Sequence, residues 1–446
     1  MNRGSAVKRI RFALGLAVWL VATACTGGGG EQQSPSGATS GVVDLVIWHG
    51  YGRLAAPGEE PNYEYNSLQA LVDTYMKLHP NVHIELVYYN NDNALTKLTV
   101  ALQADRQPDI TYQYGSSMPQ LATTPKVVDL TDRVQDPSFG WDDFFPGERA
   151  AATVDGRVLG VPALVDNLAI VYNKDLFDQA GLAYPSPDWT WDQFRTAARA
   201  LTDPAKKHYG WVFPTDGLED TVWHWDAMLW EAGGDILNAD NTKAAFNSAA
   251  GVQALTMLQD IAKDGSIYFD YAPDSPKTDN LFNSGFIGMK VTGPWALPAY
   301  PDANYGVQIM PSFGDPANHQ TIAGPDNWVI MDNGPQRVDA AWEFMKWFTD
   351  PEQILQDSVT TGHLPTRASV ASLPGFDQLD RKYPGVGEFA ENLANVLKAR
   401  PSLTTYPQIS AEIGQAVVKA MLGKATPQQA LDEAAAKVNG ILAIPQ

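Results

Sequence analysis

The sequence predicts an α/β protein built from two lobes. Three observations lead to this prediction: a length of 446 residues of which 44% are hydrophobic, segments typical of strands and helices that alternate along the chain, and a second start of the same alternation after Gly160. A chain of this length usually forms more than one core. Alternating strands and helices favour sheets of mostly parallel strands with helices packed on them.

The first alternation begins at Val42. The segment VVDLVIWHG, residues 42–50, is a short apolar run that ends in glycine, the pattern of a buried strand. Apolar residues recur on one helical face over 67–78, and Pro80 ends that helix. The segments that follow are predicted as a strand over VHIELV, a helix over 93–104 and a strand over PDITYQY.

The second alternation begins after Gly160 with the strand-like segment LAIVYN. Thr190 and Gln193 have the spacing of a capping box, so they predict a helix that begins there and ends before Pro204. Further helices are predicted over 222–231, 249–263, 339–349 and 412–422.

Residues 1–24 are predicted to be a signal peptide. Arg3, Lys8, Arg9 and Arg11 precede an apolar run over 12–22 that is too short for an ordinary membrane-spanning helix. The only cysteine, Cys25, follows small residues in VATAC, which resembles the bacterial lipoprotein processing site and implies a lipidated thiol. Several acyl chains would anchor the protein stably, with the Gly-, Ser- and Pro-rich residues 25–41 as a flexible tether. An ordinary secreted protein with an incidental cysteine is the alternative.

The charge balance is strongly acidic. The whole chain carries a formal net charge of −20, and removal of residues 1–24 would take away only positive charges. Nucleic acid and anionic lipid surfaces repel a negatively charged protein, so this charge argues against binding to either.

Motifs for catalysis and metal binding are missing from the sequence. The 51 Asp and Glu residues could supply the two opposed carboxylates of a glycoside hydrolase, but none of them stands in a defensible motif. A G-x-S-x-G elbow, a His-Glu-x-x-His helix and a phosphate-binding glycine loop are all absent. His79 and His83 flank Pro80 and cannot share a helical face as metal ligands. We therefore expect a protein that is not an enzyme and has no cofactor or metal, with a secreted glycoside hydrolase as the alternative.

The aromatic residues indicate a binding function. The chain has 13 tryptophans, and several stand beside Gly, Asn or Asp where predicted elements end: Trp48, Trp223, Trp225, Trp295 and Trp328. Indole faces pack against the C–H faces of sugar rings, and neighbouring polar side chains bond the hydroxyl groups. This mixture predicts a neutral, hydroxyl-rich ligand.

Two groups of tryptophans are expected to differ in role. In SGFIGMKVTGPW, Gly293 and Pro294 predict a corner that directs Trp295 away from the preceding strand. Trp342 and Trp347 belong to an amphipathic helix and are expected in the core.

Several blocks of the sequence resemble, in order, the extracellular solute-binding proteins of ABC importers. The blocks are GRVLGVPALVDNLAIVYNKDLFDQAGL, PDWTWDQF, LWEAGGDIL, FNSGFIGMKVTGPWAL and TTGHLPTR, and the resemblance covers essentially all of the chain after residue 41. It is nearest to the carbohydrate-binding, maltose-binding-protein-like class. The resemblance implies the type II periplasmic-binding-protein-like fold, in which each of two lobes is a mostly parallel sheet flanked by helices, and hinge crossovers join the lobes around a ligand cleft.

Matching the blocks places the crossovers near residues 165–168, 307–311 and 357–364. Lobe one would then comprise residues 42–165 and 311–356. Lobe two would comprise residues 166–310 and 357–446.

The resemblance also implies the ligand-binding residues. Trp295 matches the family's sugar-stacking tryptophan, Trp223 matches a stacking aromatic residue, and Asp166 matches a hydroxyl-binding carboxylate at the hinge. The other implied contacts stand beside these positions, at the ends of first-lobe strands or in the later blocks: Trp48, His49, Ser116, Ser117, Asn167, His224, Asp326, Asn327, Arg367 and Tyr406.

The implied function is that of the binding component of a carbohydrate ABC importer. It would be a monomer on the outer face of the cytoplasmic membrane, would capture a neutral sugar or oligosaccharide, and would deliver it to the permease subunits. Gln113 stands where maltose-binding protein has an aromatic residue, so maltose itself is not implied.

Two further interpretations stay open. The motif WHG is similar to glycerol-phosphate-binding relatives, which favours a glycerol-phosphate-type binding protein, but the predicted cleft has no Arg or Lys cluster for a phosphate group. A sugar-binding adhesion or sensing module without a transporter would show the same aromatic residues.

Overall fold

The structure is a computed structural model that describes residues 41–57, 62–272, 276–314 and 319–444. The predicted signal peptide, Cys25 and the tether up to residue 40 lie outside the described residues. No helix of the described part is long and apolar enough to cross a membrane.

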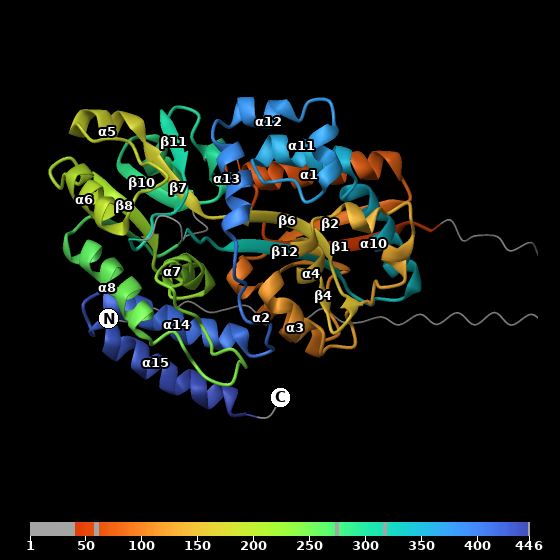
Figure 1. Cartoon of the computed structure of the whole chain (residues 1–446). Helices are drawn as coiled ribbons and strands as arrows, with labels where there is room; N and C mark the ends of the chain where they lie inside the picture. Colours follow the sequence, from red (N-terminus) through yellow and green to blue (C-terminus); the bar gives the residue numbers. More distant parts are fainter. Residues whose placement is uncertain (1–40, 58–61, 273–275, 315–318, 445–446) are drawn as a thin grey trace, which may run out of the picture. The chain divides into compact units, whose positions relative to one another are not determined.

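The first lobe is built on a five-stranded sheet in the order β2-β1-β3-β12-β6 (Figure 1). Its strands are β1 (Val43–His49), β2 (Val82–Tyr88), β3 (Ile110–Tyr114), β6 (Val161–Asn167) and β12 (Ala323–Ile330). Strand β1 pairs in parallel with β2 and β3, whereas β12 pairs antiparallel with β3 and β6. Strand β12 therefore runs against the other four strands of this sheet.

Helices cover both faces of the first sheet. They are α1 (Tyr63–Leu78), α2 (Asn91–Gln103), α3 (Met118–Leu121), α4 (Pro146–Ala151), α10 (Pro335–Phe348) and α11 (Pro351–Thr361), and the short hairpin of β4 (Thr153–Val154) and β5 (Arg157–Val158) lies beside them. Alternate residues of β1 point to opposite faces, as the period of two requires: Leu45 and Ile47 enter one core, and Trp48 packs against the other. Trp342 is buried in the larger core and Trp347 packs against it, which confirms the expectation for both.

The second lobe repeats this architecture with the strand order β11-β7-β10-β8-β9. Its strands are β7 (Ala169–Asn173), β8 (Tyr209–Pro214), β9 (Ile267–Asp270), β10 (Ile287–Thr292) and β11 (Tyr305–Gln308). Strand β7 is antiparallel to β10 and β11, and β8 is parallel to β9 and β10. Both sheets thus have one strand that runs against the rest, and the predicted fold class is confirmed.

The helices of the second lobe form two layers around its sheet. They are α5 (Lys174–Ala180), α6 (Trp191–Leu201), α7 (Glu219–Glu231), α8 (Ala249–Lys263), α9 (Lys277–Asn283), α12 (Asp377–Lys382), α13 (Val386–Asn392), α14 (Tyr406–Met421) and α15 (Pro427–Leu442). The C-terminal helices α14 and α15 lie side by side next to α8, and α14 also packs on α7 (Figure 1). A large aromatic core that includes Trp191, Trp211 and Trp225 fills the space between these helices and the sheet.

The chain passes from the first sheet to the second between Asn167 and Ala169, and it returns between Gln308 and Ala323. Strand β6 stays in the first sheet through Asn167, two residues beyond the predicted lobe limit. The segment after Asp357, assigned to lobe two from the sequence, first contacts lobe one: Asp357 accepts a hydrogen bond from Ser67 of α1, and Ser369 contacts Asp143. Val359 and Leu364 then pack into the core that covers the second sheet, as do α12 and the helices after it.

Candidate functional site

A cleft of about 860 Å³ lies between the two sheets. Residues of the first lobe line one wall, among them Tyr51, Tyr112, Asp166 and Asp326, and residues of the second lobe line the other, among them Trp223, His224, Asp270 and Trp295. Strands that run parallel bring their carboxyl ends to one edge of a sheet, and ligands of open α/β sheets bind in the crevice at that edge. The cleft is therefore where a ligand of this fold is expected.

Four rings form a series across the floor of the cleft. Tyr51 lies 6.1 Å from His363, His363 lies 6.4 Å from Trp295, and Trp295 lies 5.8 Å from Trp223, measured between ring centroids. Neighbouring planes differ by 29°, 30° and 31°, so the rings lie roughly parallel. Tyr51 follows β1 of the first lobe and the two indoles belong to the second, so this series, the ring ladder, joins the lobes.

Two glycines make room for close contacts that hold two members of the ring ladder in place. The indole of Trp295, in the short 3-10 helix Pro294–Ala299, folds back over Gly293, where a Cβ atom would lie 1.6 Å from the ring. Gly362 precedes His363, has a left-handed φ of +83°, and packs so closely that a Cβ atom would lie 2.5 Å from the carbonyl oxygen of Pro294. These contacts bring His363 beside Trp295 although 68 positions separate them in the sequence.

The first of four acid–base groups in the cleft is built around His363. Its Nδ1 contacts Asp166 Oδ2, and Asp166 Oδ1 accepts a hydrogen bond of 3.2 Å from the amide of Leu364. Its Nε2 lies 3.5 Å from Glu64, at the start of α1. Burial by itself lowers the pKa of His363, but the charges of Asp166 and Glu64 outweigh burial and raise that pKa well above its usual value.

The second group pairs Asp220 with His224 in the first turns of α7. His224 Nδ1 lies 2.9 Å from the carbonyl oxygen of Asp220, and Nε2 lies 3.2 Å from that of Val291. A carbonyl oxygen only accepts, so both ring nitrogens can be satisfied only when both carry protons. Burial opposes this charge, but the Asp220 carboxylate, 3.4 Å from Nδ1, favours it, and the pKa of His224 is raised overall.

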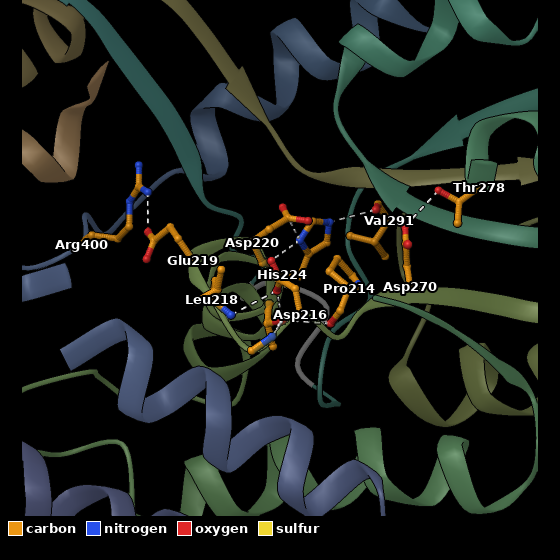
Figure 2. A network of polar contacts seen from close by, with 12 residues as sticks. Pro214, Asp216, Leu218, Glu219, Asp220, His224, Asp270, Thr278, Val291 and Arg400 are labelled. Atoms are coloured by element: carbon orange, nitrogen blue, oxygen red, sulfur yellow. Dashed lines mark hydrogen bonds and ion pairs between the residues drawn. The ribbon is translucent and has the colours of Figure 1, made fainter. Parts of the chain in front are cut away.

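The third group pairs Glu219 with Arg400. Figure 2 shows Glu219 and Asp220 next to each other at the start of α7, with Arg400 reaching Glu219 from one side and His224 bonded on the other. Arg400 Nη1 donates to Glu219 Oε1 at 2.7 Å, while Ser410 donates to Glu219 Oε2. Carboxylates are favoured in the first turn of a helix, because free N–H groups and the helix dipole stabilise negative charge there.

The fourth group lies at the far end of the second-lobe wall. Lys290 of β10 contacts Asp279 of α9, and Tyr300 donates to the same carboxylate at 2.6 Å. Asp270, at the end of β9, accepts a hydrogen bond of 3.2 Å from Thr278, which Figure 2 also shows. Burial raises the pKa of Asp270.

Asp326 of β12 accepts hydrogen bonds from uncharged donors: the hydroxyl of Tyr112 and, at 3.4 Å, the amide of Gly115. Burial raises the pKa of Asp326 to about 7, against the lowering effect of the Tyr112 hydrogen bond. This carboxyl group therefore changes charge close to neutral pH.

Five of the residues predicted from the sequence line the cleft: Asp166, Trp223, His224, Trp295 and Asp326. The structure places the others outside its lining. Trp48 packs against Tyr89, with ring centroids 4.2 Å apart, because it stands on the face of β1 turned toward α2. His49 is buried with rings of Tyr65 and Tyr88 near it, and burial lowers its pKa to about 4.

The remaining predicted residues are held by the protein itself. Ser116 and Ser117 form the short 3-10 helix Gly115–Ser117 after β3. Asn167 donates to the carbonyl of Phe389, and Asn327 is buried on the opposite face of β12 from Trp328. Arg367 donates to the carbonyls of Phe139 and Gly140 and stacks on two phenylalanine rings, so its guanidinium does not face the cleft. Tyr406 donates to Glu219 at 3.3 Å from behind the cleft wall.

Sequence reasoning missed the residues that complete the cleft: Tyr51, Glu64, Glu219, Lys290, Arg400 and His363. His363 stands inside the block TTGHLPTR, so that motif was the signal that could have found it. The sequence predicted no Arg or Lys cluster for a phosphate group at the cleft. Arg53, Lys290 and Arg400 do line it, and Lys290 and Arg400 each contact a carboxylate. Among the described residues, no group of His, Cys, Asp and Glu could hold a metal ion.

Two α/β lobes around a cleft with neighbouring indoles and paired polar groups define the class of substrate-binding proteins. The family model for bacterial extracellular solute-binding proteins matches residues 60–354, so the chain belongs to this family. It is a solute-binding protein of ABC transporters.

Three similar proteins illustrate the range of the family. The sn-glycerol-3-phosphate-binding periplasmic protein UgpB of Pectobacterium atrosepticum is 25% identical over 430 residues, which cover 91% of this chain and 93% of that protein. The solved cyclic alpha-maltosyl-1,6-maltose binding protein of Arthrobacter globiformis is 30% identical, with a TM-score of 0.69 and coverage of 90% and 99%. A solute-binding protein of Thermotoga lettingae, solved with alpha-D-tagatose, is 26% identical, with a TM-score of 0.77 and coverage of 90% and 100%.

Proposed function

We propose that this protein captures an uncharged sugar or oligosaccharide in the cleft and delivers it to the permease of a carbohydrate ABC importer. The observation that carries this proposal is the combination of two roughly parallel indoles, Trp223 and Trp295, with polar groups of both lobes. Indole faces suit the C–H faces of a sugar ring. Paired acids and bases offer acceptors and donors to hydroxyl groups.

The charge arrangement supports an uncharged ligand over an anionic one. Of the Lys and Arg side chains of the cleft, the two that are not exposed, Lys290 and Arg400, each contact a carboxylate. The lining holds more carboxylates than basic side chains, namely Glu64, Asp166, Glu219, Asp220, Asp270, Asp279, Asp302 and Asp326. A phosphate group would meet repulsion here, whereas hydroxyl groups would not.

Binding would act by a shift of population between open and closed arrangements of the lobes. A ligand that touches Asp326 on one wall and Trp295 on the other contacts both lobes only when they are close together, so it stabilises the closed arrangement. The permease would recognise that closed form.

The attachment to the membrane is a further part of the proposal. Cys25 would carry the lipid and residues 25–41 would be the tether. Fractionation of cells that produce the Cys25→Ser variant tests this part: the variant should leave the membrane fraction, and its persistence there would exclude a lipid on this residue.

Thermal-shift screening against monosaccharides, oligosaccharides, glycerol 3-phosphate and glycerol tests the ligand class. A ligand that binds the folded state alone raises the melting temperature. We expect a rise with one or more uncharged sugars, followed by calorimetry for affinity and by an assay that finds no new reducing ends. A rise with glycerol 3-phosphate alone would replace this proposal with the second candidate below.

The second candidate is a glycerol-phosphate-type binding protein. Arg400 in the cleft wall favours it, since guanidinium groups bind phosphate well, and one relative is named for sn-glycerol 3-phosphate. The contact of Arg400 with Glu219 opposes it.

A further inference from the structure

We propose that Glu219 is a specificity-determining residue that masks Arg400 and thereby makes the cleft select uncharged ligands over phosphorylated ones. This inference rests on the proposed function. It concerns the pair of Glu219 and Arg400 within the cleft and assigns a role in ligand specificity to Glu219.

Arg400 has the properties of an anion receptor. Its side chain is 6% exposed, it lines the cleft, and it comes from the segment between α13 and α14 rather than from the sheet edge. A guanidinium group is weakly hydrated, always charged, and shaped to bind two oxygens of a phosphate. By itself, such a group in a cleft would attract phosphate.

Glu219 prevents this by occupying the guanidinium. Its Oε1 accepts from Arg400 at 2.7 Å, and the Glu219 charge raises the pKa of Arg400 although burial lowers it. A phosphate that approached Arg400 would have to displace Glu219 or lie beside a carboxylate, and both cost free energy.

Glu219 cannot easily turn away from Arg400, because the surrounding side chains hold it. Ser410 donates to Oε2 and Tyr406 donates to Oε1 at 3.3 Å, both from α14 behind the cleft wall. The Glu219 side chain is 14% exposed. Glu219 and Arg400 therefore stay paired in the cleft wall, and the net charge of the pair stays near zero.

The variant Glu219→Gln keeps the shape of the side chain and removes its charge. We expect it to gain affinity for glycerol 3-phosphate by about tenfold or more over the wild type, measured by calorimetry, with the gain shrinking as salt concentration rises. The double variant Glu219→Gln/Arg400→Gln should lose the gain, because the receptor is gone. Glu412→Gln, which removes a carboxylate that pairs with Lys437 outside the cleft lining, is the matched control for net charge and should bind as the wild type does.

Three outcomes would overturn the inference: wild type that binds glycerol 3-phosphate as tightly as Glu219→Gln does, a folded variant without any gain, or an equal gain in Glu412→Gln. If Glu219→Gln fails to fold, the wild type alone still tests the inference. A thermal shift of the wild type with millimolar glycerol 3-phosphate would contradict the masking of Arg400 by Glu219. Failure of the proposed function looks different: the wild type would bind no sugar of the panel, while the variant still gained phosphate affinity through Arg400.

Discussion

At the scale of residues, the surroundings of the Trp295 ring depend both on its neighbours in the sequence and on residues far away in the sequence. The Gly-Pro corner after β10 turns the indole out of the strand, which the sequence indicates, while His363 and Trp223 decide that the ring has neighbours of similar orientation. A preformed aromatic surface loses little entropy when a sugar packs on it.

The variant Trp295→Ala should therefore weaken sugar binding by about 2 kcal/mol, roughly a thirtyfold loss of affinity. Calorimetry with the sugar found by screening measures it. Trp48→Ala is the matched control, since Trp48 is also half-buried but lies outside the cleft lining, and it should bind normally. Equal losses in both variants would contradict the assignment of the cleft.

Asp326 gives a second prediction at this scale, because its pKa of about 7 in the folded protein exceeds the value of about 3.9 in an unfolded chain. Between these values the folded state holds a proton that the unfolded state has lost, so the contribution of Asp326 to stability falls as pH rises from about 4 to about 7 and stays low above that.

Removing the charge with Asp326→Asn should stabilise the protein more at about pH 8 than at about pH 5, by a difference on the order of 1 kcal/mol. Chemical denaturation at both pH values measures this difference. Asp339→Asn, which removes an exposed carboxylate, is the control and should show no such difference. A larger gain at the lower pH would refute the assigned direction.

At the scale of elements, local sequence signals predicted which segments form helices better than they predicted the residue at which each helix begins. Helix α8 has the predicted limits 249–263, and α6 has the predicted capping box of Thr190 and Gln193. Helices α1, α7 and α14 each begin earlier than predicted. Helix α1 begins earlier because the Asn62 side chain accepts a hydrogen bond from the Tyr65 amide and caps the helix.

The capping box of α6 should be worth about 1 kcal/mol, which Thr190→Ala would remove. Thermal or chemical unfolding measures the loss. Thr196→Ala, inside the same helix, is the control: its hydroxyl bonds back to the carbonyl of Asp192, so alanine there should be neutral or slightly stabilising. The idea fails if both variants lose the same stability.

At the scale of the whole molecule, ligand binding should bring the two lobes together. Small-angle scattering with saturating sugar should give a smaller radius of gyration than without it, because the ligand stabilises the arrangement in which both walls touch it. Trp295→Ala at the same sugar concentration should stay closer to the unliganded value. An unchanged radius in the wild type at proven saturation would argue against closure.

The sequence by itself determined the α/β class, most strands and helices, the family, and the cleft residues that stand in contiguous motifs, such as Trp295 and Asp166. These features depend on neighbours a few positions apart, through hydrophobic period, caps and turns. Only the tertiary structure decided that His363 reaches Asp166, that Arg400 reaches Glu219, and that Arg367 and Tyr406 turn away from the cleft. The physical reason is that a charged or aromatic side chain takes its role from partners far away in sequence, and those partners are fixed only when the two sheets and their crossovers have packed.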